Sequence, residues 1–304
     1  MRGYKLVGMV IAVLAMAGAP ALAQVDCANI PVSTGAPSQE YIDACYNPAV
    51  ATGGVEGPTD NAWGPESQRG SLDYMVLNAP EVLTSVGAVT FTDFVGGCDF
   101  ANNDFSQLYC GDTAGNFFTL STADATRTPI GTFTAPGSQT ITGLAWDATT
   151  STMYRCTTDV AASSLLTVDL GTGAATLVGT ITGSAGMIAC AVDPAGAMWG
   201  YDIVDDSFYG INKATGAGTL VGALGFDANF GQGMDFDHDD GTCYMFAFNN
   251  GVFLSELRTC DTATGATTLV GTMGATTPGG LLQWGGGAVA TNDVPVELMS
   301  IGVE

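Results

Sequence analysis

The chain has 304 residues, of which 7 are Lys or Arg and 30 are Asp or Glu, so its formal net charge is −23. Proteins that bind nucleic acid or anionic lipid use clustered basic side chains. Beyond the first few residues the basic side chains here stand singly, at Arg69, Arg127, Arg155, Lys213 and Arg258, so neither partner class is expected. The acidity suits a cationic partner, a divalent cation or a salty environment, or serves solubility alone.

The first 23 residues have the organisation of a secretory signal peptide. Arg2 and Lys5 precede an apolar run from Leu6 to about Ala17, and residues 21–23 form a small-x-small cleavage site. The run is short for a bilayer span, and an uncleaved anchor is the alternative. We therefore expect a secreted, periplasmic or cell-surface protein with no membrane span after cleavage.

Residues 24–71 are rich in Pro, Gly, Ser and Asn and predict an extension packed against the domain that follows. One short helix is expected from Ser38, as its N-cap, to Cys45. A disulfide between Cys27 and Cys45 would staple this segment in an oxidising compartment.

A sequence motif that recurs in the second half of the chain predicts the architecture. Residues 168–179 read VDLGTGAATLVG, and close copies end at Gly222 and Gly271. Each copy is typical of a β-hairpin, because an apolar strand ending in Asp or Asn meets a Thr-Gly turn and then a β-branched run that closes on Gly. Asp169 is expected to accept hydrogen bonds from the turn amides, and Gly173 to supply a positive φ. Weaker copies bring the closing glycines to Gly87, Gly131, Gly179, Gly222 and Gly271.

A second pattern lies between the hairpins. In it a Gly or Ala begins an apolar strand, and a second strand with an aromatic residue follows. Its copies are residues 97–100 with Tyr109, residues 143–147 with Tyr154, residues 189–193 with Trp199, and residues 233–237 with Tyr244. Each unit therefore contains four antiparallel strands, and units recurring roughly every 40 to 50 residues are typical of propeller blades. We predict an all-β fold, a β-propeller of five four-stranded blades over residues 72–291.

The two ends of the array are expected to share the closing blade. Residues 280–290 would supply its first two strands, and Leu72–Asn78 and Val82–Val89 its last two. Closure of this kind leaves no open sheet edge in the ring. Residues 292–304 are expected to form a C-terminal tail.

All eight cysteines follow the signal peptide, so disulfides are expected. Cys98 and Cys110 would lie opposite each other on neighbouring strands, and Cys243 and Cys260 on successive strands of one unit. That leaves Cys156 with Cys190, a bridge between adjacent units. Metal ligation is the alternative, but the chain lacks a Cys-x-x-Cys motif and His238 is its only histidine.

The acidic stretch at residues 235–241 resembles the start of a calcium loop. Asp235, Asp237 and Asp239 are the candidate metal ligands, and calcium is the one cofactor that the sequence suggests. However, Asp240 and Phe246 stand where an EF-hand needs Gly and Glu. The alternative is turn structure, because Asp237 aligns with a turn aspartate in two other units.

No catalytic residue is predicted. The chain has no Gly-x-Ser-x-Gly elbow and no second histidine to complete a metal or triad motif with His238. Asp99 and Asp235 nevertheless occupy equivalent first-strand positions near the expected ring axis. Carboxylates placed there could act as an acid–base pair or with a metal ion.

The phrase at residues 212–222, NKATGAGTLVG, resembles the repeats of secreted bacterial β-propeller proteins. The resemblance covers residues 72–291 and implies the hairpin architecture, with no active-site motif. The sequence departs from the WD and kelch signatures. Residues 293–298 are similar to junctions that precede C-terminal sorting regions of exported bacterial proteins.

Three functional hypotheses follow from these observations. The first is a non-catalytic secreted or cell-surface scaffold that binds a protein, a glycan or a cation. The second is a secreted enzyme, a metal-assisted hydrolase, lyase or lactonase with carboxylates at the channel mouth. The third is a subunit of a surface assembly. The lack of a nucleophile motif and of paired histidines favours the first hypothesis.

Overall fold

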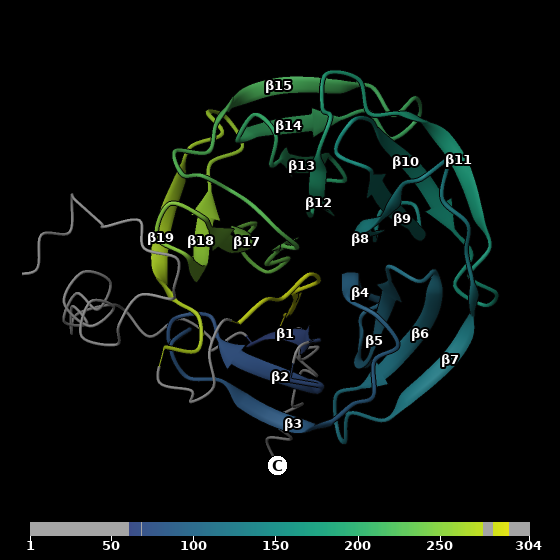
Figure 1. The fold of residues 1–304 in the computed structure, drawn as a ribbon, viewed down its shortest axis with the longest axis vertical. Helices are drawn as coiled ribbons and strands as arrows, with labels where there is room; N and C mark the ends of the chain where they lie inside the picture. The colour runs from purple at the N-terminus through teal and green to yellow at the C-terminus, as the bar shows by residue number, and fades with distance from the viewer. Residues whose placement is uncertain (1–60, 68, 276–281, 292–304) are drawn as a thin grey trace, which may run out of the picture.

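The computed structural model describes residues 61–67, 69–275 and 282–291. Within these ranges the regular secondary structure is all β, in five four-stranded antiparallel sheets arranged around one axis (Figure 1). The predicted five-bladed propeller is therefore confirmed. In the same ranges no helix has the length and hydrophobicity needed to cross a membrane.

Each blade is one sheet, with its first strand nearest the axis and its last strand on the rim (Figure 1). The closing blade contains β20 (Ala288–Ala290), β1 (Asn61–Glu66), β2 (Ser71–Val76) and β3 (Thr84–Ala88). The next contains β4 (Val95–Ala101), β5 (Asp104–Asp112), β6 (Asn116–Ser121) and β7 (Arg127–Thr132). It is followed by β8 (Thr140–Asp147), β9 (Thr152–Thr158), β10 (Ser163–Val168) and β11 (Ala175–Thr180). The fourth contains β12 (Met187–Val192), β13 (Met198–Asp202), β14 (Ser207–Ile211) and β15 (Gly218–Ala223). The fifth contains β16 (Gly233–Phe236), β17 (Cys243–Asn249), β18 (Leu254–Cys260) and β19 (Thr267–Thr272).

The closing blade corrects one prediction. The C-terminal segment supplies one strand, β20, and the N-terminal segment supplies three, so the expected division of two and two is wrong. The second strand of this blade is β1, which lies upstream of residue 72 and pairs with both β20 and β2. Its composition, rich in Gly and Pro, conceals the strand in the sequence. The informative residue is Trp63, which pairs with Ala288 as Tyr154 pairs with Ala145 in another blade.

The repeated hairpin works as a contact between blades. Asp169 accepts hydrogen bonds from the Gly171 amide at 3.1 Å and the Thr172 hydroxyl at 2.7 Å, and Gly173 has a φ of 76°, as predicted. The carbonyl oxygen of Thr172 then lies where a side chain on Gly131, the closing glycine of the preceding blade, would have to sit. The same contact recurs between Thr215 and Gly179 and between Thr264 and Gly222. The turn and the closing glycine are therefore two halves of one interface.

The hydrophobic core is divided into five clusters, each shared by two neighbouring blades. In one of them, for example, Tyr201 and Phe208 of the fourth blade pack with Met245 of the fifth. Because apolar burial is the main stabilising contribution to folding, the blades stabilise one another rather than folding as separate units.

Three disulfides are present among the described cysteines, and all three match the predicted pairing. Cys98–Cys110 and Cys243–Cys260 join directly opposed residues within a blade, with Cα–Cα distances of 4.1 and 5.2 Å. Cys156–Cys190 joins two blades, with a Cα–Cα distance of 6.4 Å. Disulfides at this density are typical of an oxidising compartment.

Several predictions fall outside the described residues. They are the signal peptide, most of the N-terminal extension with its short helix, the Cys27–Cys45 disulfide, and the C-terminal tail.

Candidate functional site

The axis of the ring is closed at its middle by glycines. Gly97, Gly143, Gly233 and Gly286 occupy equivalent places on or beside the innermost strands, and Ala189 takes the fifth place. A Cβ on Gly97 would lie 2.6 Å from the carbonyl carbon of Gly143, and one on Gly233 would lie 2.5 Å from the amide nitrogen of Gly287. Backbone therefore packs on backbone between neighbouring blades around the axis. Among the described residues, the space between these glycines does not admit a water molecule, and a cavity lies on each side of it along the axis.

The larger cavity, which we call the axial cup, lies at the carboxyl ends of the innermost strands and has a volume of about 250 Å³. Its lining combines two carboxylates, one imidazole and an aromatic wall with small polar residues. The lining residues are Asp99, Phe100, Ala101, Asn103, Phe105, Trp146, Ala148, Pro194, Asp235, Phe236, His238, Val289 and Thr291. A concave pocket with apolar walls and a few converging polar groups is the usual form of a ligand site.

The second cavity is smaller, about 170 Å³, and lies at the amino ends of the same strands. Its walls are mainly apolar and include Phe94, Ile141, Ile188 and Gly231. None of the residues given for its lining is an Asp, Glu or His, so it has fewer groups than the axial cup that could bind a charged ligand or transfer a proton.

The structure brings Asp99 and Asp235 into one cavity, as their repeat positions predict. Asp99 pairs with Tyr109 and Asp235 with Tyr244 across the first two strands of their blades. In the other three blades the residues paired with this aromatic are all alanines, namely Ala145, Ala191 and Ala288. The fold therefore accepts a methyl group at this position, and the two aspartates are additions to it.

Each aspartate bridges its own strand to the innermost strand of the next blade. Asp99 accepts hydrogen bonds from the Phe100 amide at 2.7 Å and the Trp146 amide at 2.5 Å. Asp235 accepts from the Phe236 amide at 2.8 Å and the Val289 amide at 2.7 Å. The side chains are only 7% and 6% exposed. The backbone thus fixes both carboxylates at the floor of the cup.

Burial determines the protonation behaviour of this pair. Burial raises the pKa of Asp99 well above its usual range, and the charge of Asp235 raises it further, against the opposing hydrogen bonds from the backbone amides. Burial also raises the pKa of Asp235 from 3.8 to about 6, although His238 and the amides of Val289 and Phe236 work in the opposite direction. Asp235 is therefore mostly ionised at neutral pH, whereas Asp99 releases its proton less readily than an exposed aspartate does.

The three candidate calcium ligands have different environments. Asp235 is at the cup floor, whereas Asp237 begins the turn between β16 and β17 and accepts a hydrogen bond from the Asp239 amide at 2.9 Å. The Gly241 amide closes this turn on the Asp237 carbonyl at 2.8 Å. Among the described residues, no group of three or more His, Cys, Asp or Glu side chains is placed to share a metal ion. Calcium binding by these aspartates stays a prediction, and the turn accounts for Asp237.

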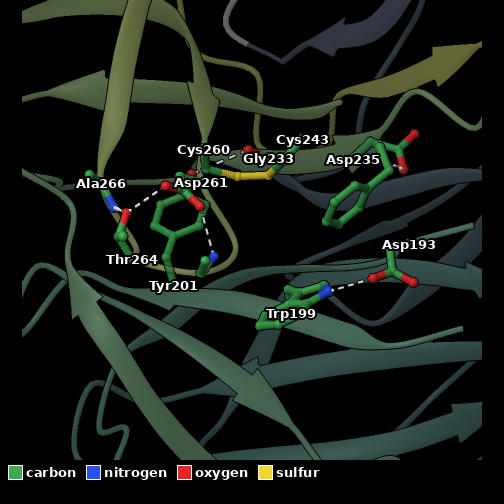
Figure 2. Close-up of a disulfide and its surroundings, with 12 residues drawn as sticks. Asp193, Trp199, Tyr201, Gly233, Asp235, Cys243, Cys260, Asp261, Thr264 and Ala266 are labelled. Carbon is green, nitrogen blue, oxygen red and sulfur yellow. Dashed lines mark hydrogen bonds between the residues drawn. A yellow bond between two sulfur atoms is a disulfide. The ribbon is translucent and has the colours of Figure 1, made fainter. Parts of the chain in front are cut away.

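Equivalent turn aspartates in other blades behave in the same way. Asp193 accepts hydrogen bonds from the Ala197 amide at 2.8 Å and from the Trp199 indole at 2.9 Å (Figure 2). The neighbouring Tyr201 hydroxyl donates to the Gly233 carbonyl at 3.2 Å, which ties the fourth blade to the innermost strand of the fifth (Figure 2). His238 places Nε2 3.1 Å from the Val192 carbonyl, which positions its ring at the cup wall.

The aromatic wall of the cup is the part of the site that sequence reasoning missed. Phe100, Trp146 and Phe236 each follow directly the position that Asp99 occupies in its blade. The repeat alignment alone could have identified these aromatic residues, because each is next in sequence to an axis-facing residue on the same innermost strand and so lies near the axis as well.

We expect the free energy of unfolding to rise as the pH is lowered from about 8 to about 4.5. Asp235 has a higher pKa in the folded chain than in the unfolded chain, so the folded state binds more protons in this range. The difference between 3.8 and about 6 corresponds to about 3 kcal/mol in total, of which about 2 kcal/mol is gained over this pH range. Urea unfolding at several pH values measures this rise, and Asp235→Ala should reduce it by about that amount.

An opposite effect limits the gain at lower pH. Burial alone would raise the pKa of Asp147, but hydrogen bonds from Lys213, Thr149 and Thr150 lower it to about 2. Its contribution to stability is present above about pH 4 and is lost as the pH falls toward 2.

An Asp235→Ala variant whose stability rises as steeply as that of the parent between pH 8 and pH 4.5 would contradict the assignment of Asp235.

Comparisons with known proteins show likeness of fold alone. No protein-family model matches the chain, and no curated protein sequence matches it. It is similar to a chain in a crystal structure of a nidogen/laminin complex, with a TM-score of 0.52 and 11% identity over 76% of this chain and 98% of that one. It is also similar to a protein of unknown function from Bacteroides caccae, with a TM-score of 0.45 and 9% identity over 76% and 99% of the two chains. A third similar structure is virginiamycin B lyase from Staphylococcus aureus, with a TM-score of 0.43 and 9% identity over 69% and 65%.

Proposed function

We propose that this protein is an exported, non-catalytic β-propeller that binds a ligand in the axial cup. The observation that carries the proposal is the cup itself: a blind cavity of about 250 Å³ with an aromatic wall and a carboxylate floor. The three disulfides support export to an oxidising compartment. A chain of similar fold is part of a nidogen/laminin complex, which is compatible with a binding role for this fold.

Rigidity also supports binding. The floor of the cup is made of innermost strands that pack backbone on backbone, and its carboxylates are held by amides of two blades. A preformed site of this kind loses little conformational entropy when it takes up a ligand. Function on a propeller depends on such a site rather than on the ring.

We expect a bulky substitution at the cup rim to abolish binding without harming the fold. Ala148 lines the cup and is solvent-exposed, so Ala148→Trp should fill the cavity and weaken any cup ligand at least tenfold. Ala214 is also an exposed turn alanine but lies on the rim hairpin, so Ala214→Trp is the matched control. A thermal-shift screen of glycans, peptides, amines, lactones and esters identifies the ligand, and calorimetry on both variants locates it.

The alternative is an enzyme, a secreted hydrolase or lyase that uses the carboxylate pair. The specific observation in its favour is that Asp99 and Asp235 line one cavity and that burial raises the pKa of both, as is common for acid–base pairs. Turnover of the same compounds distinguishes the two functions. Binding without turnover supports the proposal, whereas turnover that disappears in Asp99→Ala replaces it with the enzyme. Adding calcium to both assays, with Asp237→Ala as the variant, tests the metal-assisted form.

A further inference from the structure

Among the described residues, no Lys or Arg neutralises the carboxylates of the axial cup, and His238 is the one basic side chain in the lining of the cup. The ion pairs among the described residues are Arg69–Glu66, Arg127–Asp112, Lys213–Asp147 and Arg258–Glu256, and none includes Asp99 or Asp235. The remaining arginine, Arg155, donates to the Thr134 carbonyl at 2.8 Å, away from the cup. Burying an ionised carboxylate without a counter-charge is unfavourable.

Three of the five blades form without an acid at this position. Ala145, Ala191 and Ala288 occupy the equivalent positions in the other three blades. Two desolvated aspartates that a methyl group could replace are retained at an energetic cost, and such a cost is typical of a functional site. A bound positive charge would offset it.

The walls of the cup select among cations. A calcium ion takes six to eight oxygen ligands, whereas four aromatic residues, Phe100, Phe105, Trp146 and Phe236, line this cavity beside its two carboxylates. Aromatic rings attract organic cations and, with a carboxylate, form the sites that recognise ammonium groups. The volume of about 250 Å³ restricts the ligand to a compact molecule.

We propose that the axial cup binds a compact organic cation, a primary or quaternary amine, with its positive charge on the Asp99–Asp235 floor and its carbon atoms against the aromatic wall. This inference rests on the proposed binding function and names its ligand class. The net charge of −23 raises the local concentration of cations around the ring and thereby favours capture.

The test compares an organic cation with an uncharged analogue of the same shape. Calorimetric titration of the full chain with choline chloride and with 3,3-dimethyl-1-butanol, the uncharged carbon analogue, isolates the charge. We expect choline to bind at least tenfold more tightly than the analogue, and Asp235→Ala and Asp99→Ala each to weaken choline at least tenfold. Asp261→Ala, at an exposed rim turn, is the matched acidic control and should leave binding unchanged.

A pH series adds a second readout. The titratable side chains that line the cup are Asp99, Asp235 and His238, whereas β8 and β20 contribute Trp146 and Val289, which do not titrate. Since a cation requires an ionised carboxylate, its affinity should fall about tenfold between pH 7.5 and pH 5. Choline binding should also release protons, which titrations in two buffers of different ionisation enthalpy detect.

The outcomes separate this inference from the proposed function. Equal binding of choline and its neutral analogue, or choline binding that both alanine variants keep, overturns the cation site. If neutral compounds from the screen bind in the cup and amines do not, the cation site is wrong and the proposed binding function stands. If no compound class binds and Ala148→Trp changes nothing, both are wrong. Circular dichroism of each variant confirms that it is folded.

Discussion

Removing residues 282–304 should unfold the propeller at ordinary temperature. This truncation deletes β20, which pairs with β1, and it removes Leu282, Trp284 and Val289, which are 4%, 1% and 4% exposed. Trp284 packs against Phe246 with a ring-centroid distance of 5.7 Å. Each large apolar side chain contributes about 1.5–3 kcal/mol on burial, and a domain has only about 5–15 kcal/mol in total. Thermal melting followed by circular dichroism, with size-exclusion chromatography, measures the loss.

A shorter truncation is the control for that experiment. Stopping the chain after Thr291 keeps β20 and every described contact, so its melting temperature should match that of the full chain. Trp284→Ala should give an intermediate result and cost about 3–5 kcal/mol. A chain lacking residues 282–304 that melts like the full chain and stays monomeric would refute this account of closure.

Gly97→Ala should destabilise the ring by about 1–3 kcal/mol or more, a large effect for one methyl group. The added Cβ would lie 2.6, 2.7 and 2.8 Å from backbone atoms of Gly143 and Leu144. Backbone atoms cannot rotate away as a flexible side chain can, so two blades must separate at the axis. Urea unfolding of the variant measures the cost, and Gly97→Val should increase it.

A glycine with free space around it provides the comparison. Gly171 lies in a rim turn, and a Cβ there would meet one atom, the Asp169 Oδ1, at 3.5 Å. Gly171→Ala should therefore change the free energy of unfolding by less than about 0.5 kcal/mol. Equal effects of the two substitutions would show that the closed axis does not depend on glycine.

Most of the fold can be predicted from the sequence because each blade repeats the same local sequence pattern. The Asp-x-x-Thr-Gly turn, the alternating strands and the aromatic of the second strand can each be read in one unit and checked in the next. The closing blade is the exception. Its strands come from the two ends of the chain, and β1 has no repeat partner within its own neighbourhood of the sequence. Its assignment requires the pairing of Trp63 with Ala288, which is a long-range contact.

The candidate site could be predicted in part. Repeat alignment places Asp99 and Asp235 at equivalent positions near the axis, and the structure finds them in one cavity. The depth of the cup could not be predicted, because it depends on how closely the innermost strands approach at Gly97, Gly143 and Gly233. The protonation of the pair also depends on burial, which only the assembled ring produces.

The contact between a Thr-Gly turn and the closing glycine of the preceding blade has a direction. Thr215 projects toward Gly179, and Thr264 toward Gly222, so each blade offers a protrusion on one side and a recess on the other. Such an interface is heterologous, and a heterologous interface forms a ring only if its rotation closes. At the final junction, Gly271 meets the ring of Pro80 in place of a Thr-Gly turn. Pro80 lies in the turn between β2 and β3, so this junction joins the fifth blade to the closing blade and completes the ring. A chain unable to form it would present complementary ends able to join other copies into linear polymers.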